Sequence, residues 1–176
     1  MLEDSIWQMG FDNHHINAIT GNSQVLYNRI KASIAKAKTI DIIVSFLMES
    51  GVKMIIRDLK EAIDRGVSIR ILTGNYLNIT DPQALYLLRS ELGDKVDLRF
   101  YNVPNKNFHL KAYIFHYQID GEIYIGSSNL SKGTLTTSIE WNYCLVKSKY
   151  QEDFNYFILL SKKKKQRYYL HKLDLK

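Results

Sequence analysis

Two short segments in the second half of the chain carry side chains suited to binding a phosphate. The first begins with His109 and Lys111, at the start of HLKAYIFHY (109–117), whose β-branched and aromatic residues predict a strand. Because side chains alternate between the two faces of a strand, His109 and Lys111 share one face and Leu110 takes the other. An imidazole and an ammonium that point together can bind an oxyanion, although the pair alone also fits a surface histidine beside a solvated lysine.

The second segment is Gly126-Ser127-Ser128-Asn129, at the end of another predicted strand (122–128). Glycine lets the backbone approach a ligand closely, and short polar side chains donate hydrogen bonds. A histidine, a fixed cation and these donors together suit an anionic group such as a phosphate. The glycine spacing of GEIYIGSS (121–128) also resembles a nucleotide-binding P-loop, but that loop needs a lysine where Ser127 stands, which argues against nucleotide hydrolysis.

Alternating helices and strands must position these two segments. Apolar residues at helical spacing predict helices over 24–38, from 52 to a cap at Gly66, and from the capping sequence Thr80-Asp81-Pro82 to Gly93. Strands are predicted over 39–47, 67–74, 95–102, 109–117, 122–128 and 139–147, with Gly51 separating the first strand from the next helix. This order predicts an α/β sandwich, a mixed β-sheet flanked by helices, with helical crossovers first and an antiparallel portion later.

The longer strings FHLKAYIF (108–115), IYIGSSNLS (123–131) and IEWN (139–142) resemble the signature of the phospholipase D superfamily, in which a strand carries His-x-Lys and a Gly-Ser-x-Asn turn follows the neighbouring strand. ILTGNYLNITDPQAL (71–85) and KVDLRFYN (95–102) look like the phospholipase D-like domain found at the N-terminus of superfamily 2 DEAD/DEAH-box helicases and in restriction systems. The resemblance implies a phospholipase D-like domain over 20–148, between an N-terminal extension (1–19) and a basic C-terminal tail (149–176).

The resemblance also implies hydrolysis of a phosphodiester without a metal or other cofactor, by two His-x-Lys motifs that meet in one site. His109 would be the nucleophile and form a phosphohistidine. Lys111 would neutralise the phosphoryl oxygens, and Asn129, Ser127 and Ser128 would donate hydrogen bonds to them. Glu140 matches a family glutamate that accepts a hydrogen bond from the imidazole Nδ1, although a salt-bridged surface glutamate is the open alternative.

The sequence holds one such motif, so a second histidine has to come from elsewhere. Single-motif members of the family build the site across a two-fold homodimer, with His109 of each chain face to face, one as nucleophile and the other as general acid. One position departs from the family pattern. Where many members carry an aspartate five residues after the lysine, this chain has His116, with Asp120 and Glu122 farther along, and we expect no catalytic role for His116.

Composition narrows the class of protein. The 176 residues, of which 45% are hydrophobic and 24% charged, fit one globular domain. The first residues lack an apolar signal core, and no apolar segment is long enough to span a membrane. Cys144 is the single cysteine and lies in an apolar stretch, which favours a buried thiol. Together these features favour a cytoplasmic protein.

The net charge of +6 favours a partner that carries phosphates, such as nucleic acid. Nearly all of the excess lies in 149–176, where 8 Lys and Arg stand against 3 Asp and Glu. There the run SKKKKQRYYLHK could follow a phosphate backbone and stack bases on Tyr168 and Tyr169, or it could be a solvated, frayed terminus. The pair His14-His15 fits a flexible segment better than a metal site.

Together with the resemblance, these observations favour a metal-independent nuclease that acts on DNA or serves a helicase or restriction system. A lipid substrate is less favoured, because a phospholipase should show an apolar groove or an amphipathic segment that faces a membrane. The alternative from a different class is a catalytically weak nucleic-acid-binding or dimerisation module that keeps the fold and the phosphate pocket.

Overall fold

The computed structural model describes residues 17–20, 25–103, 105–163 and 170–172. Its helices are α2 (Leu26–Lys36), α3 (Glu49–Asp64), α4 (Pro82–Leu92), α5 (Lys132–Thr136) and α6 (Gln151–Lys163), with 3-10 turns η1 (Tyr76–Asn78) and η2 (Gly93–Lys95). Its strands are β1 (Ala18–Ile19), β2 (Thr39–Ile43), β3 (Ser68–Gly74), β4 (Val96–Tyr101), β5 (Ala112–His116), β6 (Gly121–Gly126), β7 (Asn142–Val146) and β8 (Leu170–Lys172).

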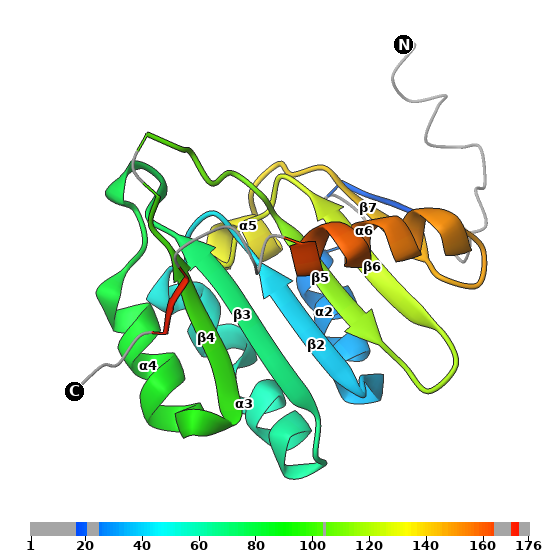
Figure 1. Ribbon diagram of the computed structural model, residues 1–176, viewed down its shortest axis with the longest axis horizontal. Helices are drawn as coiled ribbons and strands as arrows, with labels where there is room; N and C mark the ends of the chain where they lie inside the picture. The colour runs from blue at the N-terminus through cyan, green and yellow to red at the C-terminus, as the bar shows by residue number, and fades with distance from the viewer. Residues whose placement is uncertain (1–16, 21–24, 104, 164–169, 173–176) are drawn as a thin grey trace.

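All the described strands form one mixed sheet in the order β1-β7-β6-β5-β2-β3-β4-β8 (Figure 1). The strands β2, β3 and β4 are parallel to one another, and helices α3 and α4 form the crossovers between them. From β5 onward the neighbours in the sheet are antiparallel. The predicted fold class, a mixed sheet flanked by helices with its antiparallel portion later in the chain, is confirmed.

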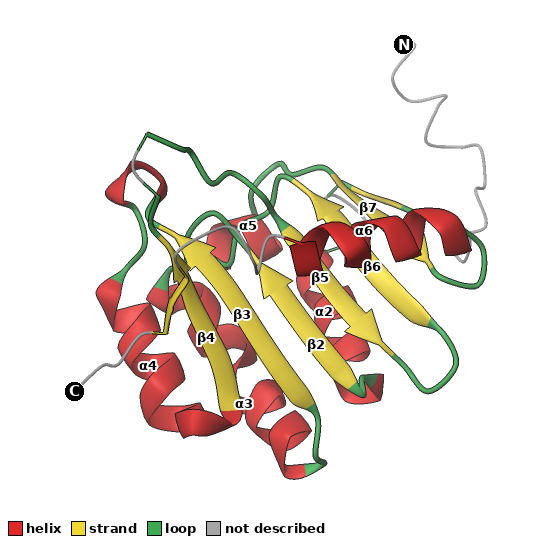
Figure 2. Ribbon diagram, viewed as in Figure 1, coloured by secondary structure: helices red, strands yellow, loops and turns green. Residues whose placement is uncertain are grey.

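The two faces of the sheet are covered unequally. Helices α2, α3 and α4 cover one face, where the larger hydrophobic core forms, and α6 crosses part of the other (Figure 2). Strand alternation assigns the side chains of β5 to these two layers: Tyr113 and Phe115 belong to the larger core, whereas Ile114 belongs to the smaller one. One face of the sheet is therefore covered by three helices, and the other, thinly covered face is covered only in part by α6.

The predicted helix boundaries hold where capping residues set them. The Asp81 side chain accepts a hydrogen bond from the backbone N–H of Gln83 at 2.9 Å, and Pro82 opens α4. At the start of α3 the prediction was wrong, because Gly51 lies inside the helix instead of before it. A Cβ at Gly51 would stand 2.4 Å from the backbone of Leu130, so the glycine allows α3 to approach the segment that follows β6.

The predicted flanking segments both contribute to the fold. Strand β1, at the end of the predicted extension, pairs with β7, and β8 pairs with β4. Helix α6 buries Phe154 against Ile114, Ile123 and Leu145 of the sheet. The chain beyond 149 therefore begins with a helix that packs on the domain, which the charge pattern did not predict. His14, His15, Tyr168 and Tyr169 lie outside the described residues.

Candidate active site

The predicted site residues gather at one edge of the sheet. The strands β3, β4 and β6 end at this edge, and the antiparallel β5 and β7 begin there. Lys111 directly precedes β5, Ser127 directly follows β6, and Glu140 lies just before β7. Strand pairing alone thus brings together side chains that are far apart in the sequence.

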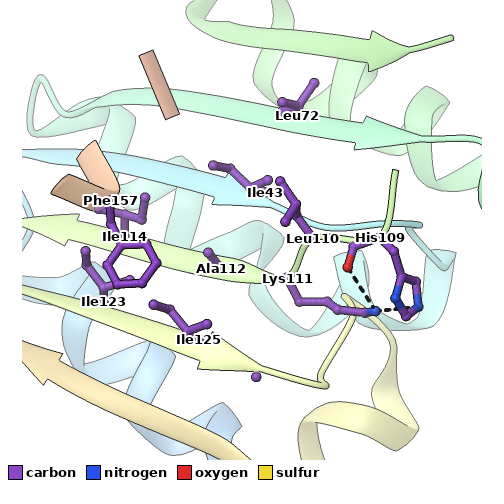
Figure 3. A pocket seen from close by; sticks show the side chains of 11 residues that line it. Ile43, Leu72, His109, Leu110, Lys111, Ala112, Ile114, Ile123, Ile125 and Phe157 are labelled. Atoms are coloured by element: carbon purple, nitrogen blue, oxygen red, sulfur yellow. Dashed lines mark hydrogen bonds between the residues drawn. The ribbon is translucent and has the colours of Figure 1, made fainter. Parts of the chain in front are cut away.

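His109 and Lys111 point toward each other (Figure 3). The strand predicted over 109–117 is shorter than expected, because β5 begins only at Ala112 and both residues precede it. Nζ of Lys111 lies 2.7 Å from Nε2 of His109 and 3.4 Å from the His109 carbonyl oxygen. An ammonium can only donate, so in this pair Nε2 accepts and the imidazole proton belongs on Nδ1. The arrangement holds the imidazole directly beside a cation.

Lys111 is held in a low-dielectric position. Its side chain is 9% exposed, although it carries a charge. Burial lowers the pKa of Lys111 from 10.5, because it disfavours the charged form, and the nearby carboxylate of Glu140 acts in the opposite direction. A cation with this little hydration interacts more strongly with an incoming anion than a solvated lysine does.

Asn129 is fixed in place by the backbone around it. Its side-chain oxygen accepts a hydrogen bond from the N–H of Phe46, just beyond β2, at 3.2 Å. Its carbonyl oxygen accepts from the N–H of Ser131 at 3.0 Å and from the hydroxyl of Thr134. Since the side-chain oxygen is engaged, the amino group Nδ2 is the part of the carboxamide left to donate to a ligand.

Ser127 and Glu140 form a hydrogen-bonded pair between β6 and β7. The Ser127 hydroxyl donates to a carboxylate oxygen of Glu140 and accepts from the N–H of Trp141 at 3.0 Å. Within the single chain, the hydrogen-bond partner of Glu140 is therefore Ser127 and not the Nδ1 of His109 that the resemblance implied. Trp141, the residue after Glu140, is 75% exposed.

The side chain of Ser128 points into the protein interior. It is fully buried, and its hydroxyl donates to the carbonyl oxygen of Thr134 at 3.2 Å and accepts from Nδ2 of Asn142 at 2.9 Å. A hydroxyl enclosed in this way does not face solvent, so we leave it out of the candidate phosphate contacts. Its hydrogen bonds link the turn after β6 to the first residue of β7.

Tyr76 is a site neighbour that sequence reasoning missed. Its ring centroid lies 4.5 Å from that of His109, with the two planes inclined at 37°. Tyr76 belongs to η1, the turn that follows β3, and His109 is reached only after β4 and a further loop. Neither spacing nor residue type signals this contact, because the pairing of β3 with β4 and of β2 with β5 creates it.

The displaced acidic residues lie at the opposite end of β5 from Lys111. Asp120 accepts hydrogen bonds from the N–H of Gly121 and from the N–H and hydroxyl of Ser148. Although partial burial acts in the opposite direction, these hydrogen bonds and Lys147 lower the pKa of Asp120 from 3.8. Asp120 therefore stabilises the turn between β5 and β6 and does not touch the candidate site.

Glu122 and Cys144 form part of a polar cluster under the helices. The Glu122 carboxylate accepts hydrogen bonds from the hydroxyls of Ser33, Tyr117 and Tyr124. Burial and the charge of Glu122 raise the pKa of the half-buried Cys144 to about 11, so it stays a neutral thiol at physiological pH. This cluster joins α2 to the sheet and leaves the sulfur unreactive.

An apolar groove of about 440 Å³ extends from the candidate site across the thinly covered face of the sheet (Figure 3). His109, Leu110 and Lys111 lie at one end of it, and Phe157 of α6 lines it as well. Between them the lining is aliphatic: Ile43, Leu72, Ala112, Ile114, Ile123 and Ile125. This is a feature that sequence reasoning expected of a lipid-binding protein and did not expect here.

No three His, Cys, Asp or Glu side chains among the described residues are grouped so that they could hold a metal ion. None of the described helices has both the length and the apolar character needed to cross a membrane.

Comparisons with known proteins agree with the geometry. Residues 30–158 match the family described as "Cardiolipin synthase, PLD-like domain". Among solved structures, Nuc from Salmonella typhimurium, a phospholipase D family member, superposes with a TM-score of 0.62 at 16% identity, over 89% of this chain and 97% of that one. Curated protein sequences contain no significant match.

Two other solved structures share the fold. NucT from Helicobacter pylori has a TM-score of 0.50 at 19% identity and covers 71% of this chain and 84% of its own. Phosphatidylserine synthase from Haemophilus influenzae has a TM-score of 0.56 at 15% identity, over 88% of this chain and 38% of its own. At these identities the similarity establishes the architecture, and the activity has to be argued from the site residues.

Proposed function

Because the chain belongs to the phospholipase D superfamily, with its family match over residues 30–158, we propose that it is a metal-independent phosphodiesterase that hydrolyses DNA through a phosphohistidine on His109. The observation that carries the proposal is the 2.7 Å contact between Lys111 Nζ and His109 Nε2 at the sheet edge. The contact supports the proposal, because a buried cation beside an imidazole suits a nucleophile that starts the reaction neutral.

Substrate binding would activate this pair. A phosphoryl oxygen that takes the Lys111 ammonium as its hydrogen-bond donor releases the lone pair of His109 Nε2, which then attacks phosphorus. The P–N bond forms as the bond to the leaving oxygen breaks. Lys111 and Nδ2 of Asn129 neutralise or hydrogen-bond the other oxygens. The Ser127 hydroxyl joins them when its single proton, which Glu140 accepts in the free chain, turns to the phosphate.

A second histidine has to protonate the leaving oxygen and later remove a proton from the attacking water. We assign this role to His109 of a second copy of the chain in a two-fold dimer. Since His109 is exposed at the edge of the sheet, an isologous contact can bring the two imidazoles to one phosphate. In this mechanism one histidine begins neutral and the other begins protonated.

The dimer can be tested by dilution. If two chains share one site, the specific activity falls when the protein is diluted below the dimer dissociation constant, and sedimentation shows the same transition. A monomer that keeps its full specific activity at every concentration would contradict the shared site while leaving a role for His109 intact.

DNA is the proposed substrate because the basic excess of 149–176 favours a polyanion. The proposed partner is a helicase or restriction system, and the proposed location is the cytoplasm. The apolar groove favours a second candidate, a phosphodiesterase for phospholipids. Its aliphatic lining could hold part of an acyl chain while Lys111 and His109 engage the headgroup phosphate at its end.

A cleavage assay in EDTA distinguishes these functions. Wild-type protein, His109→Ala and the control Lys60→Ala, an exposed lysine on α3, are incubated with single- and double-stranded DNA and with phosphatidylglycerol vesicles. We expect wild type and control to cleave DNA and His109→Ala to be inactive, with a labelled phosphate trapped on wild-type protein that is stable to alkali and labile to acid. Cleavage of the vesicles instead of DNA would favour the second candidate.

Two outcomes would overturn the proposal. Cleavage that requires a divalent cation contradicts the metal-independent mechanism. Binding of DNA without cleavage by wild-type protein, at concentrations where it is dimeric, would identify a nucleic-acid-binding module that keeps the fold.

A further inference from the structure

A small polar pocket of about 130 Å³ lies beside the candidate site, at the carboxyl ends of β3 and β4. The turn after β3 contributes Asn75 and Tyr76, and the end of β4 with the loop that follows contributes Tyr101, Asn102, Lys106 and Asn107. In open α/β sheets, ligands bind in crevices outside the carboxyl ends of parallel strands, and this pocket occupies that position. It shares no lining residue with the apolar groove.

Tyr76 connects the pocket to the reaction centre. Its ring lines the pocket and also lies 4.5 Å from the imidazole of His109, centroid to centroid. Phe108, the residue before His109, lines the pocket as well and stacks on Tyr101 with centroids 4.9 Å apart. Tyr76 therefore lies between a ligand in the pocket and the imidazole of His109.

The chemistry of the lining selects for a polar planar ring. Asn102 and Asn107 are exposed, and their carboxamides have no hydrogen-bond partner among the residues that the structure describes. Each carboxamide offers both donors and an acceptor, the combination that reads the edge of a nucleobase. The ammonium of Lys106 adds a positive charge to the same wall. The volume is below the 300–1,000 Å³ or so of pockets that hold larger ligands, so it suits one ring better than an acyl chain.

Backbone strain gathers around the same pocket. Within the described part of the chain, the non-glycine residues with positive φ are Leu77 (53°), Asn78 (58°) and Asn105 (60°), and all three lie in the two loops that form it. Asparagine tolerates this conformation, but leucine does so at a cost. Leu77 is also 72% exposed, so burial of its side chain does not repay that cost. Strain of this kind clusters at ligand-binding sites.

We propose that this pocket is a nucleobase subsite, which holds the base of the nucleotide next to the scissile phosphate. The proposal rests on the proposed phosphodiesterase activity and narrows its substrate to a nucleic-acid strand. The base enters between the loops after β3 and β4, and its edge is hydrogen-bonded by Asn102 and Asn107. Lys106 contacts the adjoining phosphate.

The test compares two substrates that share the reacting bond. Bis(p-nitrophenyl) phosphate has a diester phosphate without a base, whereas a single-stranded oligodeoxynucleotide fills the subsite. The variant is the double substitution Asn102→Ala and Asn107→Ala, and the control is Asn28→Ala, an exposed asparagine on α2. We expect the double variant to lose about tenfold in kcat/KM for the oligonucleotide, because buried hydrogen bonds to the base are lost. Its kcat/KM for bis(p-nitrophenyl) phosphate should stay within about twofold of wild type.

Each remaining outcome counts against one of the two proposals. An equal loss of kcat/KM for both substrates would mean that the loops only support His109. An unchanged kcat/KM for the oligonucleotide would mean that the pocket holds no base. Either result overturns the subsite. If wild type hydrolyses neither substrate, the proposed function fails. The subsite is then decided by fluorescence anisotropy with a labelled oligodeoxynucleotide, where equal affinity of wild type and double variant would overturn it.

Discussion

The ammonium of Lys111 lies 2.7 Å from Nε2 of His109, so the cation and the nucleophile proposed for one reaction are hydrogen-bonded to each other before substrate arrives. This contact protects the nucleophilic lone pair and keeps a charged group satisfied in a position that is 9% exposed. A phosphoryl oxygen that replaces the imidazole as the partner of Lys111 changes both residues at once. Binding and activation are thereby coupled through a single hydrogen bond.

Replacement of Lys111 by methionine, which keeps the length of the side chain, should remove this coupling. We expect kcat for bis(p-nitrophenyl) phosphate to fall by about 10²–10³, the loss typical when a charge-stabilising donor is removed. The apolar substitute fits a buried site, so the folded state should persist, as circular dichroism and thermal unfolding can check. Retention of more than a tenth of wild-type kcat would show that Lys111 does not stabilise the transition state.

The pH dependence should follow the ammonium. Burial lowers the pKa of Lys111 below 10.5, and the reaction needs the charged form, so kcat/KM should decline as the pH rises through a value below 10.5. The negative charge of Glu140 opposes this lowering of the pKa. Glu140→Gln removes the charge and keeps an acceptor for the Ser127 hydroxyl. The alkaline limb of the pH profile should therefore move to lower pH in Glu140→Gln. An alkaline limb that stays at the same pH or moves to higher pH in Glu140→Gln would show that a group other than Lys111 causes it.

The site also depends on a close backbone approach at Gly126. A Cβ at this position would lie 2.2 Å from the backbone oxygen of Trp141, so Gly126→Ala must separate the end of β6 from the start of β7. Ser127 and Glu140 are hydrogen-bonded across this junction. We therefore expect Gly126→Ala to lose at least tenfold in kcat/KM for both bis(p-nitrophenyl) phosphate and the oligodeoxynucleotide, roughly 1.4 kcal/mol of transition-state stabilisation. The control is Gly133→Ala, whose Cβ would meet only the Ser138 hydroxyl at 3.2 Å. Equal activity of the two variants would contradict the importance of the junction.

Local sequence signals predicted most of the elements, because these follow from periodicity. The contact of His109 with Lys111 was expected from strand alternation, but both residues lie just before β5. Contacts that depend on how strands are ordered could not be predicted in this way. The ring of Tyr76 reaches His109 only through the sheet order, and Ser128 turns into the core although it stands between two polar neighbours. Gly51 illustrates the same limit, since a glycine that ends a helix and one that admits another backbone look alike in a sequence.

Helix α6 was not predicted, because the basic run 162–165, which begins in its last turn, dominates the composition of 149–176. Phe154 packs against the sheet and is 2% exposed. We expect Phe154→Ala to lower the free energy of unfolding by about 3 kcal/mol, because it leaves a cavity between α6 and β6. Tyr156→Ala on the same helix, at a position that is 59% exposed, should change it by less than about 0.5 kcal/mol. Urea unfolding of both variants measures the difference, and similar values would mean that α6 is not part of the cooperative unit.

The basic residues 162–165 test whether the net charge acts in binding or only in solvation. Their replacement by glutamine, in a His109→Ala background that prevents cleavage, should weaken binding to a labelled oligodeoxynucleotide. The slope of log K against log salt should become less steep by about 0.7 for each lysine that contacts a single-strand phosphate. The matched control replaces four exposed lysines elsewhere, Lys31, Lys53, Lys60 and Lys95, and changes the net charge equally. If both sets reduce the slope alike, the effect is one of overall charge; if only 162–165 does, this run lies along the bound strand.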